Sequence, residues 1–102
     1  MIQELDTNGF DQLDKSGSMM VEFYSKVCGP CKMLAFVLRD IDKAKPDFPI
    51  YTIDFDENKE LKERLGVKGF PIMLFLKDGE EVNRITGLQQ KPAIVKAIDE
   101  IL

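Results

Sequence analysis

The chain of 102 residues contains no histidine, no tryptophan and only two cysteines. Without histidine or a second cysteine pair, the usual tetrahedral zinc ligand set cannot be assembled from one chain, so a shared metal would require a second copy. No apolar run approaches the roughly 20 residues of a membrane span, and residues 1–12 lack the apolar core of a signal peptide. We therefore expect a cytoplasmic protein with no metal site and no membrane contact.

Charge of neither sign dominates the chain. Its 14 basic and 18 acidic residues are interspersed and give a formal net charge of -4, without the basic patch that nucleic acid binding requires. There is no internal repeat or low-complexity segment, and 44% of the residues are hydrophobic, which is typical of a globular protein. We expect a single domain, residues 1–102, that works as a monomer on proteins or small molecules.

Both cysteines lie in one motif, Cys28-Gly29-Pro30-Cys31, between an apolar run and a helical pattern. In a reducing compartment two close cysteines are more often catalytic or metal-binding than structural. Thiolate attacks disulfides, and a helix N-terminus stabilises negative charge, so Cys28 is predicted to be the nucleophile and the more acidic and exposed sulfur. One helical turn brings Cys31 beside it, placed to resolve a mixed disulfide. Gly29 leaves the approach open, and Pro30 suits a first helical turn.

Helical and strand patterns alternate along the rest of the chain. A short helix is expected from a cap at Thr7 or Asn8 to an end at Gly17, and Asp78-Gly79 predicts a tight hairpin. The other expected elements are strands at 19–24, 50–55, 72–76 and 81–86, a long helix from the cysteine motif to residue 45, and helices at 57–65 and 92–102. Right-handed crossovers then give a three-layer α/β/α sandwich, with a mixed sheet of four to five strands and about four helices.

Over essentially its whole length the chain resembles the thioredoxin family. Residues 21–33 resemble the family's active-site strand, loop and helix start, and Gly69-Phe70-Pro71 resembles its glycine, apolar residue and cis-proline. Lys77-Asp78-Gly79-Glu80 resembles its hairpin, and Gly87 falls where a glycine borders the substrate groove. The resemblance implies the thioredoxin fold and a thiol–disulfide oxidoreductase that reduces protein disulfides. It also implies a thioredoxin-reductase-type electron donor and no bound cofactor beyond a redox-active Cys28–Cys31 disulfide.

The resemblance also implies which residues meet the substrate. The loop at Pro71 would face the cysteines, and the backbone of Phe70 would pair with an extended substrate segment, which makes substrate choice broad. The implied substrate-binding residues are Val27, Gly29, Pro30, Phe70, Pro71 and Gly87. Read without the resemblance, Pro71 is an ordinary trans-proline, because only about one X-Pro bond in twenty is cis, and Gly87 is a turn glycine.

Glu22 interrupts the apolar strand before the cysteine motif. A charged, unpaired carboxylate costs several kcal/mol in such a place, so burial should raise its pKa. Read alone, Glu22 is a strand residue whose side chain reaches solvent. The resemblance places it at the family's buried aspartate, which implies a general acid/base role toward Cys31.

Two positions depart from the family pattern near this site. Val27 stands where thioredoxins usually carry tryptophan, so a flat aromatic cover is missing and partner specificity is expected to differ. Thr52 replaces a lysine that often accompanies the buried acid, which should leave Glu22 more easily protonated.

Two other functions fit parts of the sequence. A binding module or assembly subunit could keep the fold with redox-idle cysteines, and the missing tryptophan is consistent with it. A glutathione-dependent, glutaredoxin-like enzyme fits less well, because those cysteine pairs typically enclose Pro-Tyr rather than Gly-Pro. Catalysed reduction of a protein disulfide separates the first alternative from an oxidoreductase, and glutathione-driven activity would indicate the second.

Overall fold

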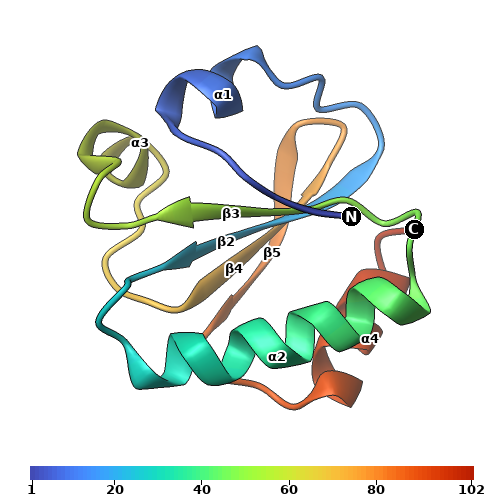
Figure 1. Cartoon of the computed structure of the whole chain (residues 1–102). Coiled ribbons are helices and arrows are strands. Elements are labelled where there is room, and N and C mark those ends of the chain that lie inside the picture. Colours follow the sequence, from blue (N-terminus) through green and yellow to red (C-terminus); the bar gives the residue numbers. More distant parts are fainter.

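The computed structural model describes all of residues 1–102. Five strands form one sheet in the order β1-β3-β2-β4-β5, and helices cover both faces (Figure 1). Helices α2 and α4 lie on one face, and α1 and α3 lie on the other. In chain order the elements are β1 Ile2–Glu4, α1 Thr7–Gln12, β2 Ser18–Tyr24, α2 Gly29–Ala44, β3 Ile50–Asp54, α3 Lys59–Arg64, β4 Ile72–Lys77, β5 Glu80–Thr86 and α4 Lys91–Asp99. The predicted three-layer sandwich around a mixed sheet is confirmed.

Strand β2 occupies the middle of the sheet. It pairs parallel with β3 and antiparallel with β4, and its five central residues are buried. Because side chains alternate along a strand, Met20 packs among α2 and α4, whereas Val21 and Phe23 pack on the side of α1 and α3. The two apolar cores therefore lie on opposite faces of β2, and its central residues are buried between them.

Helix α2 buries one apolar stripe against the sheet. Leu34, Leu38 and Ile41 are buried, and Val37 is half-buried against the same cluster. The helix ends at its cap residue Lys45, since the residue before Pro46 resists the helical region. This long helix agrees with its prediction at both ends. None of the four helices has the length and apolar character that crossing a bilayer requires.

Helix α1 departs from its prediction at both ends. Its cap is Asp6, whose carboxylate accepts a hydrogen bond from the Gly9 amide at 2.7 Å, so the predicted caps Thr7 and Asn8 are wrong. The helix ends at Leu13 rather than Gly17, which has φ +78° and stands just before β2. An aspartate one position upstream is an equally good cap, and sequence preference alone does not separate neighbouring candidates.

Strand β1 was not predicted from the sequence. It has three residues, which pair parallel with β3 through Ile2 and Ile50, Gln3 and Tyr51, and Glu4 and Thr52. Three residues are too few to establish an alternating pattern, and the strand exists because β3 offers it an edge. The sheet therefore has five strands, the upper end of the predicted range.

Candidate active site

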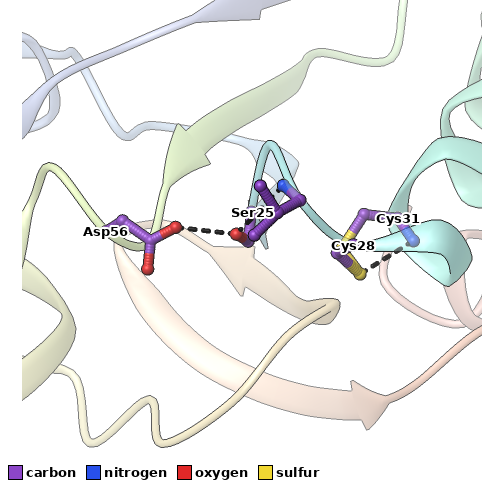
Figure 2. The surroundings of a disulfide bond; sticks show 5 residues. Ser25, Cys28, Cys31 and Asp56 are labelled. Carbon is purple, nitrogen blue, oxygen red and sulfur yellow. Dashed lines mark hydrogen bonds between the residues drawn. A yellow bond between two sulfur atoms is a disulfide. The ribbon is translucent and has the colours of Figure 1, made fainter.

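The cysteine motif lies where β2 gives way to α2. Cys28 and Cys31 form a disulfide with their Cα atoms 5.2 Å apart, and Figure 2 shows this bond at the first turn of the helix. Cys28 is the N-cap of α2, and its sulfur accepts a hydrogen bond from the Cys31 amide at 3.1 Å. Pro30 lies in the first turn, where a missing N–H costs no helical hydrogen bond. In the reduced protein, the same amide and the helix dipole would stabilise a Cys28 thiolate.

The exposure of the two cysteines differs less than the sequence suggested. Cys28 is 6% exposed and Cys31 is 4% exposed, so both are buried in the disulfide form and Cys28 is only slightly the more exposed of the two. Gly29 and Pro30 are exposed, and Val27 is 88% exposed beside Cys28. Access to the disulfide therefore passes over small or unpacked neighbours, without an aromatic cover.

A polar contact that was not predicted holds the loop before Cys28. Ser25 is buried, and its hydroxyl donates a hydrogen bond to Asp56 Oδ2 at 2.7 Å (Figure 2). The same hydroxyl oxygen accepts a hydrogen bond from the Val27 amide at 3.4 Å. Because Ser25 and Asp56 lie 31 positions apart, no local sequence pattern could have paired them.

The peptide bond between Phe70 and Pro71 is cis, as the family resemblance implies. Phe23 pairs with Ile72, and Ile72 pairs with Thr86, so Pro71 and Gly87 come next at the sheet edge where β2 ends. The Gly87 amide donates a hydrogen bond to the Pro71 carbonyl at 2.8 Å, which brings these two predicted residues together.

Phe70 presents an aromatic side chain at this edge. It is 39% exposed, and its ring meets the ring of Phe55 edge to face with centroids 5.1 Å apart. The Lys62 ammonium lies 3.7 Å from the centroid of the Phe55 ring. Phe55 and Lys62 were not singled out from the sequence, because an aromatic pair between the residue after β3 and the Pro71 loop depends on the tertiary structure.

Glu22 is buried and faces α2. It is 3% exposed, and its Oε2 atom has no hydrogen-bond partner, so the interpretation that its side chain reaches solvent is wrong. Burial raises the pKa of Glu22 to about 7. Thr52 lies directly across the strand pair from it, in the place where a lysine would have favoured the charged form.

Two separate small cavities lie along α2, one beside Glu22 and the other beside Cys31. One, of about 160 Å³, is lined by Glu22 with Thr52, Arg39 and Ala35 among others. The other, of about 240 Å³, is lined by Cys31 and Ala35, with Tyr24 and Lys32 nearby. Ala35 lines both, so its small side chain is all that the two cavities share on α2. No group of three or more His, Cys, Asp or Glu side chains is placed to hold a metal ion.

The arrangement can exchange electrons through sulfur. A helix-capping cysteine and its partner one turn later are the two thiols that thiol–disulfide exchange needs. Comparisons with known proteins point the same way. The family model for thioredoxin matches residues 1–100.

Relatives match over nearly the full length of the chain. Thioredoxin of Chlamydia muridarum is 36% identical over 100 residues, which cover 98% of each chain. Thioredoxin of Bacillus subtilis is 37% identical over 94 residues, which cover 91% of this chain and 90% of the relative.

Solved structures share the fold. A mutant thioredoxin from Halobacterium salinarum superposes with a TM-score of 0.90 at 29% identity, covering 98% of this chain and 89% of that one. Fasciola hepatica thioredoxin superposes with a TM-score of 0.88 at 26% identity, covering the whole of both chains. The sandwich is thus the thioredoxin fold, and the chain belongs to the thioredoxin family as a thiol–disulfide oxidoreductase whose redox-active group is the Cys28–Cys31 pair.

Proposed function

We propose that Cys28 is the attacking sulfur and Cys31 the resolving sulfur in the reduction of protein disulfides. The observation that carries this order is the cap of α2, where Cys28 Sγ accepts the Cys31 amide. The Cys28 thiolate attacks a substrate disulfide, forms a mixed disulfide and displaces one substrate thiolate. Cys31, after losing its proton, attacks Cys28 and releases the second substrate sulfur. The substrate gains two electrons, and the chain is left with the Cys28–Cys31 disulfide.

Glu22 is proposed as the general base that takes the proton from Cys31. Its buried carboxyl has a pKa of about 7, close to the pH at which a proton must be both taken up and given back. The cavities beside Glu22 and Cys31 both border Ala35, which supports the carboxyl and the sulfur lying close to the same stretch of α2. The lack of a cation at Thr52 keeps Glu22 protonated to a higher pH than a paired acid would be.

The proposed substrate-binding surface surrounds the disulfide. It consists of Val27, Gly29, Pro30, Phe70, Pro71 and Gly87. The pairing of Gly87 with Pro71 and the register of β2, β4 and β5 support the placing of three of these residues at one sheet edge. An extended substrate strand would pair with the backbone at Phe70, so recognition would depend little on substrate sequence.

The proposed partners are disulfide-containing proteins and a thioredoxin-reductase-type donor that restores the dithiol. The chain is proposed to act as one domain, residues 1–102, and as a monomer in the cytoplasm. A reducing compartment suits this role, because the dithiol must be regenerated after each turnover.

A trapping experiment tests the assigned order. Cys31→Ser should accumulate a mixed disulfide between Cys28 and a disulfide-containing protein, detected by mass spectrometry and released by a small dithiol. Cys28→Ser is the matched control and should form none. Trapping through Cys31 in the control would reverse the roles. No adduct on Cys31→Ser would instead favour a binding module with redox-idle cysteines.

A further inference from the structure

The loop that delivers Cys28 to the helix is short and mostly unpacked. It runs from Ser25 to Val27, between the end of β2 and the cap of α2. The Val27 side chain is 88% exposed, and Lys26 extends outward to ion pairs with Asp54 at 3.6 Å and Glu57 at 3.5 Å. Ser25 is 2% exposed, so it is the residue of this loop that the interior holds.

The Ser25 hydroxyl both donates and accepts a hydrogen bond in the loop before Cys28. It donates to Asp56 Oδ2 at 2.7 Å and accepts from the Val27 amide at 3.4 Å (Figure 2). Asp56 is itself oriented, because its amide donates to Asp54 Oδ1 at 2.9 Å. A backbone hydrogen bond joins the same two segments, since the Phe55 amide donates to the Tyr24 carbonyl at 2.7 Å. One oxygen atom thus ties the residue before Cys28 to the loop after β3.

From these contacts we propose that Ser25 is a positioning residue for Cys28, holding the loop so that the sulfur stays at the cap of α2. Cys28 caps the helix only while its backbone stays extended, at φ -117° and ψ 113°. The Val27 side chain is not packed against the protein. Loss of the Ser25 oxygen would therefore leave the Val27 amide without this acceptor and allow the loop to change conformation. The sulfur would then spend less time against the Cys31 amide, and the thiolate would lose part of its stabilisation.

This inference rests on the proposed role of Cys28 as the nucleophile. Ser25 touches neither sulfur in these contacts and acts through the loop. It is uncharged, so Ser25→Ala leaves the charges of Glu22 on β2, Lys26 in the loop, Lys32 on α2 and Asp56 after β3 unchanged. A changed titration of Cys28 would therefore report geometry rather than a lost charge.

The test is the pH dependence of iodoacetamide alkylation of Cys28 in the reduced protein, with the modified residue located by mass spectrometry. In the unmodified protein the midpoint is expected below the ordinary thiol value of about 8.5. In Ser25→Ala it should rise by about half a unit to one unit, which slows alkylation by about 3- to 10-fold at a pH well below both midpoints. The far-ultraviolet circular dichroism spectrum of the variant must match that of the protein without the substitution.

Two further variants separate positioning from general stability and from charge. Ser18 stands at the opposite end of β2, and its hydroxyl donates to the Ile101 carbonyl, so Ser18→Ala loses a comparable bond far from the site. It should unfold more easily and keep the alkylation midpoint. Asp56→Asn keeps an acceptor oxygen for Ser25 but removes the charge, and its midpoint should not rise.

The outcomes distinguish the inference from the function on which it rests. Suppose that Cys28 in the protein without substitution is alkylated before Cys31 and with a low midpoint. If folded Ser25→Ala then gives the same pH profile of alkylation, the positioning role is wrong. An equal rise in Ser18→Ala or Asp56→Asn would also overturn it, in favour of global loosening or charge. If Cys28 in the unmodified protein reacts no faster than Cys31, the proposed function itself fails, and the positioning role fails with it.

Discussion

Replacing Glu22 by glutamine should change how the stability of the fold depends on pH. Burial raises the pKa of this carboxyl from 4.5 to about 7. Below pH 4.5 the carboxyl is protonated in both the folded and unfolded states, so it adds no pH dependence to the free energy of unfolding. Between pH 4.5 and 7 the unfolded chain has released the proton while the folded chain retains it, so the free energy of unfolding falls as pH rises. Above pH 7 the loss is complete and constant.

The shift corresponds to a loss of about 3 kcal/mol between the two ends of this window. Glu22→Gln cannot ionise and should escape this loss. The difference in unfolding free energy between the variant and the unmodified protein should therefore change by about 3 kcal/mol in favour of the variant, from pH 4 to pH 8.5. Urea unfolding of the disulfide forms measures this without interference from titrating thiols.

Glu63→Gln is the matched control, because Glu63 is an exposed glutamate on α3. Its difference from the unmodified protein should stay nearly constant over the same range. A constant difference for Glu22→Gln as well would refute the burial argument, and so would a variant that becomes relatively less stable at high pH. In turnover, Glu22→Gln should still form the mixed disulfide but resolve it about 100-fold more slowly, if Glu22 is the base.

Three further predictions concern the surroundings of the site. Phe70→Ala should raise the KM for a disulfide-containing peptide about 2- to 10-fold with little change in kcat, because an aromatic contact surface is lost; an unchanged KM would exclude a contribution of the Phe70 side chain to binding. Asn58→Ala should lower the unfolding free energy by about 1–3 kcal/mol in urea, since buried Asn58 accepts from Thr7 and donates to the Asp54 carbonyl; full stability would contradict this. Equilibration with a reference dithiol should give a potential at or below the cytosolic glutathione range of about -220 to -260 mV, whereas about -120 mV would indicate an oxidant.

The long helix and the central strand were predictable from the sequence, because the spacing of their apolar residues indicates which faces are buried. The stripe of α2 and the apolar run of β2 placed the helix, the central strand and the cysteine motif between them. The tight Asp78-Gly79 turn, with φ of 50° and 82°, gave the β4–β5 pairing. Such signals arise within a single element, so one sequence suffices to read them.

Other features depend on partners that are distant in the chain. The pairing of β1 depends on β3, and the bond from Ser25 to Asp56 joins two loops. The burial of Glu22 was expected only from the family resemblance, and its unpartnered oxygen and the adjoining cavity depend on packing against α2. The cis bond at Pro71 was expected only from the family resemblance, because local preference favours trans.

The central claim is that Cys28 and Cys31 pass electrons to protein disulfides. Its most direct test is the reduction of a disulfide-containing protein by catalytic amounts of the chain, with a small dithiol supplied in excess. The unmodified protein should complete many turnovers per molecule, and Cys28→Ser should complete none above the dithiol alone. A folded, reduced protein that accelerates nothing, or a Cys28→Ser variant that keeps the full rate, would contradict the claim.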